Sequence, residues 1–224
     1  MLEILYEDNH LIAVNKSAGD LVQGDQTGDE PLVDKVKTYI KKKYNKSGAV
    51  FLGVIHRLDR PSSGVVLFAR TSKALTRMNL QFKERKTHKI YWAIVGADIA
   101  PTSATLIHWL KRNPKMNKSF AHDQEVGGSK KGVLHYKKIQ DLERYAVLEI
   151  EIETGRHHQI RSQLSHLGFP IKGDLKYGAK RSNPDGSIAL HARLLKVEHP
   201  TTKESISIVA DPPVKPEWSF ALSD

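Results

Sequence analysis

One carboxylate stands out among the side chains of this sequence that could do chemistry. Asp59 follows a short apolar run and lies between two arginines, Arg57 and Arg60. A carboxylate can attack as a nucleophile or remove a proton, and a nearby positive charge favours the ionised form that either role requires. The alternative is an aspartate that only forms a turn, because the following residues 61–64, Pro-Ser-Ser-Gly, have typical turn chemistry. Spacing alone favours the turn, since short motifs match many unrelated proteins.

A second segment rich in polar side chains spans residues 153–161, Glu-Thr-Gly-Arg-His-His-Gln-Ile-Arg. The adjacent pair His157 and His158 raises the question of a metal site. Neighbouring side chains on a helix diverge, however, and no carboxylate accompanies the pair at the spacing of metal ligands. We therefore expect no metal site here.

The elements that must position these residues are mostly strands. Short apolar runs on both sides of Asp59, at residues 54–55 and 65–68, predict two strands joined by a turn. Residues 89–95 predict a strand covered on both faces, because Tyr91 and its neighbours are apolar in both alternating sets. Further strands are predicted at residues 2–6, 11–14, 104–109, 144–152, 188–197 and 206–209.

Three helices are also expected. The first follows residues 29–31, Asp-Glu-Pro, which provide an acidic cap and a proline in the first turn. The second begins after Thr71, whose hydroxyl can cap it. The third is expected over residues 155–168 and places His158 and Arg161 on one stripe of its surface.

Length and composition fit a folded chain. The 224 residues are 39% hydrophobic and 27% charged, which is typical of a globular protein and not of a disordered one. No repeat, linker or low-complexity segment interrupts residues 1–224, so we expect one domain. Cysteine is absent, which excludes disulfides and thiolate metal sites. No apolar run reaches about 20 residues and no signal-peptide pattern is present, so we expect a cytoplasmic protein that does not bind a membrane.

The chain is basic, with 35 lysines and arginines against 25 acidic residues and a net charge of +10. Such a surface favours polyanionic partners, nucleic acid first and an anionic membrane second. Residues 111–118 form a basic polar segment, which we interpret either as a mobile nucleic-acid contact or as an ordinary charged hairpin tip. The glycine-rich residues 127–132 lack the spacing of a phosphate-binding loop and are expected to form a turn.

Three segments, in the same order, resemble the signature segments of the RluA-type pseudouridine synthases. Residues 56–65, His-Arg-Leu-Asp-Arg-Pro-Ser-Ser-Gly-Val, are similar to the segment that contains the family's catalytic aspartate. Residues 89–95 resemble the Lys-x-Tyr-x-Ala-x-Val strand of the family, and residues 153–161 with 166–174 resemble its third segment. The similarity covers most of the chain but departs at Ser17, where the family usually has proline.

This resemblance implies an α+β fold, in which a mostly antiparallel mixed sheet is flanked by helices and loops in a single catalytic domain. It also implies an isomerase that converts uridine to pseudouridine in structured ribosomal or transfer RNA. This reaction is redox-neutral, so no cofactor is expected. We further expect a monomer with no protein partner and no separate amino-terminal RNA-binding domain.

The resemblance also assigns roles to individual residues. Asp59 is the expected catalytic residue, as nucleophile or as base, and Arg161 is expected to pair with it. Tyr91 is expected to stack on the target base and to assist proton movement at its C5 atom. Arg57 resembles the arginine that fills the gap left in the RNA when that base is flipped out. The other expected RNA contacts are Arg60, Arg156, His158 and Gln159.

Two other classes of protein remain as alternatives. A non-catalytic RNA-binding module would explain the basic surface and would have no special need for Asp59. A glycoside or nucleoside hydrolase would use a pair of carboxylates, and no second acid accompanies Asp59 in the three segments.

Overall fold

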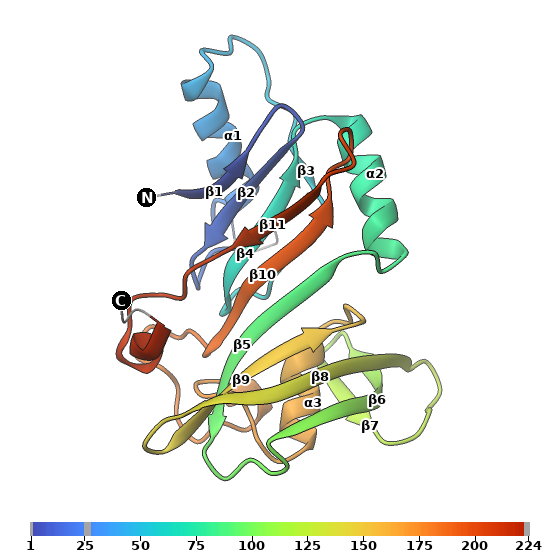
Figure 1. The fold of residues 1–224 in the computed structure, drawn as a ribbon, viewed down its shortest axis with the longest axis vertical. Helices are drawn as coiled ribbons and strands as arrows, with labels where there is room; N and C mark the ends of the chain where they lie inside the picture. Colours follow the sequence, from blue (N-terminus) through green and yellow to red (C-terminus); the bar gives the residue numbers. More distant parts are fainter. Residues whose placement is uncertain (1, 25–27, 222–224) are drawn as a thin grey trace. The chain divides into compact units, whose positions relative to one another are not determined.

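The computed structural model describes residues 2–24 and 28–221, and the chain divides into two compact units (Figure 1). Unit 1 comprises residues 1–87 and 192–224, and unit 2 comprises residues 88–191. Asp59 therefore belongs to unit 1, whereas Tyr91 and Arg161 belong to unit 2. The single domain expected over residues 1–224 stays a prediction.

The sheet of unit 1 has the strand order β1-β2-β4-β10-β11. The strands are β1 (Glu3–Glu7), β2 (Leu11–Lys16), β4 (Ser63–Ala69), β10 (Leu190–Glu198) and β11 (Ser205–Val209), with the short β3 (Gly53–Val54) also paired to β4. The β1–β2, β2–β4, β3–β4 and β10–β11 pairs are antiparallel. Nearly all residues of β2 and β4 are buried, which explains the continuous apolar runs at residues 11–14 and 65–69.

Two helices cover opposite faces of this sheet, α1 (Leu32–Lys43) and α2 (Ser72–Lys83). Alternate residues of a strand point to opposite faces, and the two core clusters divide the strand residues accordingly. The core on the α1 side contains Ile12, Val14, Val66 and Phe68, and the core on the α2 side contains Leu11, Ala13, Val65 and Leu67. The strands that flank Asp59 are thus fixed from both sides.

The starts of these helices differ from expectation in one respect. Thr71 caps α2 as predicted, because its Oγ1 accepts a hydrogen bond from the backbone N–H of Ala74 at 3.1 Å. The capping residue of α1 is Pro31 itself, which makes no side-chain hydrogen bond to the helix. The predicted acidic cap was therefore wrong, and the fixed φ of proline is the feature that suits this helix start.

The sheet of unit 2 has the strand order β5-β9-β8-β6-β7, and every neighbouring pair is antiparallel. The strands are β5 (His88–Gly96), β9 (Tyr145–Ile152), β8 (Lys130–Asp141), β6 (Ser103–Asn113) and β7 (Lys118–His122). Helix α3 (Gln159–His166) lies against one face, behind the sheet in Figure 1. Leu106, His108 and Leu110 of β6 are buried on that side, while the residues between them are more exposed.

The strand predictions for unit 2 need correction at β5 and at β8. Strand β5 is fully buried only over residues 93–95, while residues 90–92 are half-buried. Strand β6 extends to Asn113 and pairs with β7, so residues 111–118 contain the tip of a β-hairpin, as one of the two interpretations of this segment had it. Strand β8 was not predicted, because its lysines interrupt the apolar alternation that marks a strand.

The third helix is shorter than predicted. His158 has a left-handed backbone conformation with φ of 52°, which cannot continue a right-handed helix, so α3 begins at Gln159. Gly168, with φ of 91°, follows the end of the helix as expected. Antiparallel sheets with flanking helices confirm the predicted α+β fold class. No helix in the described part of the chain has the length and apolar character needed to cross a bilayer.

Candidate active site

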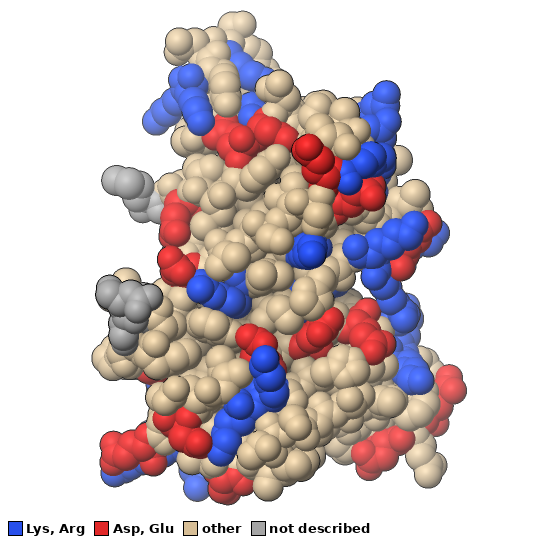
Figure 2. All heavy atoms as spheres, in the orientation of Figure 1, with Lys and Arg blue, Asp and Glu red and all other residues tan. Residues whose placement is uncertain are grey.

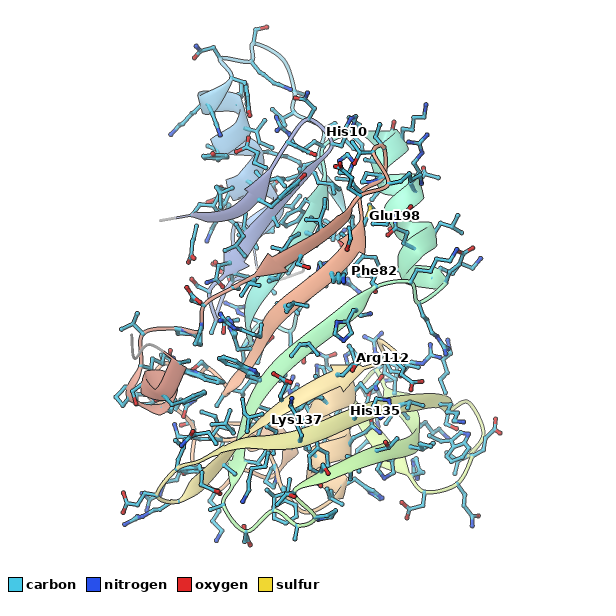
Figure 3. All side chains as sticks on the ribbon, in the orientation of Figure 1. His10, Phe82, Arg112, His135, Lys137 and Glu198 are labelled. Atoms are coloured by element: carbon cyan, nitrogen blue, oxygen red, sulfur yellow. The ribbon has the colours of Figure 1, made fainter. Side chains whose placement is uncertain are left out.

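The segment that carries Asp59 is anchored at both of its ends within unit 1. At its start, the His56 ring stacks on Phe82 with centroids 5.1 Å apart, and its Nε2 accepts a hydrogen bond from the backbone N–H of Leu67 at 3.0 Å (Phe82 is labelled in Figure 3). At its end, Ser62 donates to the carbonyl of Asp59 through its backbone N–H at 3.1 Å and its Oγ at 2.8 Å. Asp59, half-buried, therefore lies in a turn of defined shape.

A buried lysine holds the backbone of this turn. Lys16 is 1% exposed, and its Nζ donates to the carbonyls of Ser17 at 2.9 Å, Arg60 at 3.1 Å and Ser62 at 2.7 Å. Burial lowers the pKa of Lys16 to about 8, against the opposing effect of the charges of Asp20 and Asp59. Sequence reasoning assigned no role to Lys16, although a lysine at the end of a buried strand is a signal that was available.

The two arginines beside Asp59 differ in their surroundings. Arg57 is exposed, as a residue that contacts RNA must be. Arg60 forms an ion pair with Asp29 at 2.6 Å, and its Nε donates to the carbonyl of Gly19 at 3.0 Å. Arg60 thus helps to hold the turn in place, and its contact with RNA stays a prediction, as does that of Arg57.

The turn leads into β4 through a glycine that no other residue can replace without strain. Gly64 has φ of +117°, and a Cβ atom there would overlap the backbone of Ala192 on the neighbouring strand β10. Both the conformation and the close approach require glycine. The Pro-Ser-Ser-Gly sequence is therefore explained by backbone geometry as well as by turn chemistry.

In unit 2, Arg161 belongs to a buried ion pair. Its Nε and Nη2 donate to the two carboxylate oxygens of Asp174 at 2.7 Å and 2.9 Å, and both side chains are almost fully buried. The sequence did not single out Asp174, because nothing in its spacing links it to Arg161 before the fold is known. The pairing of Arg161 with Asp59 stays a prediction.

Arg161 also determines the tautomer of His158. Its Nη1 lies 3.2 Å from His158 Nε2, and because a guanidinium can only donate, Nε2 must accept. The ring proton is then on Nδ1 and is donated to the hydroxyl of Tyr177 at 2.9 Å. His158 is thus fixed as a neutral ring within a buried polar network, and its contact with RNA stays a prediction.

Tyr91 lies on the α3 side of the unit 2 sheet. It is paired with Ile150 on β9, and Ile150 is paired with Tyr136 on β8, so the three side chains point to one face. His108 points to the same face and accepts a hydrogen bond at Nδ1 from Gln163 of α3 at 3.0 Å. Tyr91 and the helix that carries Arg161 are therefore on one side of the sheet.

Gln159 and Arg156 hold the entry into α3. The amide oxygen of Gln159 accepts from Thr154 Oγ1 at 2.7 Å and from the Arg156 backbone N–H at 3.1 Å, while its Nε2 donates to the carbonyl of Val133 at 3.0 Å. Arg156 Nε donates to the carbonyl of Lys131 at 3.1 Å. These bonds give both residues a structural role, and their predicted contacts with RNA stay predictions.

The stacked rings of His157 and His158 are 3.8 Å apart and make hydrogen bonds to side chains of their own unit. A different group was not predicted: His108, Asp123 and His166 bring one potential metal-ligand atom each to within 4.8 Å of one another. Because His108 Nδ1 accepts from Gln163, the proton of the neutral ring is on Nε2, which faces Asp123 at 3.7 Å. That tautomer favours a hydrogen-bonded cluster over metal ligation.

Residues 10–166 match the family model of the RNA pseudouridylate synthases. The tRNA pseudouridine synthase C of Yersinia pestis is 30% identical over 229 residues, which cover 94% of this chain and 86% of that protein. The ribosomal large subunit pseudouridine synthase D of Xylella fastidiosa is 33% identical over 226 residues, 95% of this chain but only 66% of that protein.

A solved structure, of human RNA pseudouridylate synthase domain containing 4, is similar in fold. It has a TM-score of 0.79 at 22% identity and covers 98% of this chain and 91% of its own. The matched residues 10–166 are more than half of the chain and include Asp59, Tyr91 and Arg161. The chain therefore belongs to the RNA pseudouridylate synthase family.

Proposed function

We propose that this protein is an RNA pseudouridine synthase that isomerises specific uridines in structured transfer or ribosomal RNA, with Asp59 as its catalytic carboxylate. The observation that carries the proposal is the way the Asp59 turn is built. A half-buried carboxylate sits on a turn whose backbone accepts two hydrogen bonds from the buried Lys16, inside the segment that matches the family. This support limits where the carboxylate can lie, which suits a catalytic role.

The proposed reaction breaks the N1–C1′ bond of uridine, turns the base, and joins C5 to C1′. The proton on C5 is lost and N1 gains one, so atoms and electrons balance without any oxidant or reductant. Asp59 acts as nucleophile or as base, and both roles use its carboxylate in the ionised form. Tyr91 stacks on the uracil and assists the proton transfer at C5.

A uracil inside folded RNA must leave its stack before Asp59 can reach it. We propose that Arg57, exposed and two residues from Asp59, fills the space that the flipped base leaves. The anchored neighbours of Arg57 support this role, because Leu58 packs on the α1 core while Arg57 points outward from the same segment. Arg161 is proposed to pair with Asp59 and to hold its carboxylate in the reactive orientation.

The test uses the purified full-length chain and RNA from cells that lack the protein. We expect pseudouridine to form at a small number of defined positions in transfer or ribosomal RNA, mapped by chemical labelling of pseudouridine and sequencing. The control is RNA from the parent cells, which contain the protein, because the target uridines of that RNA are already converted to pseudouridine. No new pseudouridine in the deficient RNA would contradict the proposal.

A further inference from the structure

The outer face of the unit 2 sheet carries exposed aromatic and basic side chains at one corner. We define the outer corner as Trp109 and Lys111 of β6, Lys118 and Phe120 of β7, and Lys131 of β8. Lys111 is paired with Phe120, Trp109 with Lys131, and Asn113 with Lys118, so these side chains share one face. It is the face opposite to α3, because the alternate residues Leu106, His108 and Leu110 are the buried ones.

In the described part of the chain, no acidic side chain forms an ion pair with the cations of this corner or with those of the adjoining hairpin tip, residues 112–117. Residues 103–122 contain Lys111, Arg112, Lys115 and Lys118 and no aspartate or glutamate. Within the described residues, the side chains of Lys111, Arg112 and Lys115 form no ion pair. On the face of the molecule that Figure 2 shows, acidic and basic side chains are interspersed.

Lysines farther along the same sheet behave differently. Lys137, which Figure 3 labels on β8 beside His135, forms an ion pair with Glu149 at 2.9 Å. His135 likewise contacts Glu153 at 2.7 Å. The absence of acidic partners is therefore a local property of the corner among the described residues, and not a property of the whole face.

The corner also offers a surface for stacking. Phe120 is 38% exposed, although a phenylalanine gains most from burial. The Nζ atom of Lys118 lies 5.4 Å from its ring centroid. Lys111, Arg112, Lys115 and Phe120 also line a groove of about 470 Å³ at this hairpin. An exposed aromatic ring among unneutralised cations is the combination that binds an unpaired nucleic-acid strand, because bases stack on the ring while phosphates meet the cations.

We propose that the outer corner is a second RNA-binding site, which holds an unpaired segment of the substrate away from the base that reacts. Phosphates bind Lys111 and Lys118 of the corner and Lys115 of the adjoining hairpin tip, and one base stacks on Phe120. This inference rests on the proposed function, because an RNA substrate is what makes such a site useful. It assigns to residues 111–118 the nucleic-acid contact that the sequence left open.

The test measures the affinity of the full chain for a fluorescent 12-nucleotide single-stranded RNA of mixed sequence, between low and moderate salt. The double variant Lys111→Ala/Lys115→Ala should bind roughly tenfold more weakly at low salt. Its salt slope should fall by about 1.4, because each phosphate that the protein no longer neutralises lowers the slope by about 0.7. Phe120→Ala should weaken binding roughly fivefold or more, with little change in that slope.

Two controls match these variants. Lys41→Ala/Lys42→Ala removes the same charge from the exposed end of α1, and Ile107→Ala truncates another exposed apolar side chain on the same sheet face. Both should bind the RNA as the wild type does. All variants should unfold at the wild-type temperature, because every substituted side chain is exposed. Corner variants with wild-type affinity and slope, or an equally large decrease in affinity in the controls, would overturn the proposal and would leave an acidic protein as the candidate partner.

This binding experiment is separate from the test of the proposed function, since it needs no turnover. A wild-type protein that forms no pseudouridine, together with corner variants that lose RNA affinity, would contradict the function and support the site. A wild-type protein that forms pseudouridine, together with corner variants of unchanged affinity and KM, would contradict the site alone. With both proposals correct, the corner variants should raise KM at least fivefold and leave kcat at saturating RNA unchanged.

Discussion

At the scale of single residues, the site depends on side chains that hold others in place. Lys16 holds the turn that carries Asp59, through the carbonyls of Arg60 and Ser62, and Asp174 holds Arg161. The sequence indicated Asp59 and Arg161 by resemblance, but it indicated neither of the residues that hold them. Each of those contacts joins positions that only folding brings together, as between residues 16 and 62.

Replacing Lys16 by methionine tests its support of the turn. The variant lacks three hydrogen bonds to carbonyls at least partly enclosed by protein, so the free energy of unfolding should fall by at least about 2 kcal/mol. The exposed Lys41→Met is the matched control and should change it by less than about 0.5 kcal/mol. Urea denaturation at pH 7 gives both values.

The same pair of proteins gives a pH dependence of known sign. With a pKa of about 8 in the folded state against an ordinary value of 10.5, Lys16 binds fewer protons in the folded protein than in the unfolded one between these pH values. The free energy of unfolding then rises with pH through this contribution, which Lys16→Met lacks. The stability difference between wild type and variant should therefore grow from pH 8 to pH 10. A constant or shrinking difference would contradict the burial of the charged group.

Arg161→Met separates a structural from a catalytic role of this arginine. It leaves Asp174 buried without its partner, so stability should fall by about 3–5 kcal/mol. Adding Asp174→Asn removes the uncompensated charge and should restore part of the stability. If Arg161 also pairs with Asp59, turnover should stay at least about a hundredfold below wild type in the double variant, and Arg161→Lys should rescue poorly because lysine lacks the planar fork.

Recovery of turnover together with stability in the double variant would limit Arg161 to a structural role. The RNA affinity of each Arg161 variant is measured as well, to separate a loss of turnover from a loss of binding. Because Arg161 is buried, its removal should weaken binding to phosphates only modestly.

At the scale of elements, regular patterns were readable and backbone exceptions were not. The helices α1 and α2 and the strands around Asp59 follow from apolar spacing and from the Thr71 cap. The early start predicted for α3 failed because His158 adopts a left-handed conformation, which the sequence does not mark. Strand β8 was missed because water-exposed lysines occupy positions where the apolar alternation would otherwise show.

Gly64→Ala tests the close approach of β4 and β10. The new methyl group would overlap the backbone of Ala192, and alanine would also be held at φ of +117°, so stability should fall by about 3 kcal/mol or more. Gly127→Ala is the control, since nothing lies within 4 Å of the added atom and its φ is not positive. Thermal unfolding of both variants is the measurement. A small decrease in stability that is equal in the two variants would show that β4 and β10 can separate to accept a side chain.

At the scale of the whole molecule, the sequence predicted the fold class and a basic surface, but it did not predict which unit contains each candidate catalytic residue. The candidate residues lie in two compact units, Asp59 in one and Tyr91 with Arg161 in the other. The net charge of +10 is a sum over the chain and does not say where the charge acts. The fold shows that many cations form ion pairs, whereas those of the β6–β7 hairpin form none with the described acidic residues. We therefore expect substitutions to separate binding to RNA from chemistry on RNA.

Asp59→Asn tests the central claim most directly, because asparagine keeps the size of aspartate but is a very weak nucleophile and base. The carbonyl of residue 59, which accepts from Ser62, is unchanged, so stability should fall by at most about 1 kcal/mol. RNA affinity should stay near wild type, because it comes from phosphate contacts. We predict that the folded, RNA-binding variant forms no detectable pseudouridine on RNA from deficient cells, whereas formation at the wild-type rate would contradict the account.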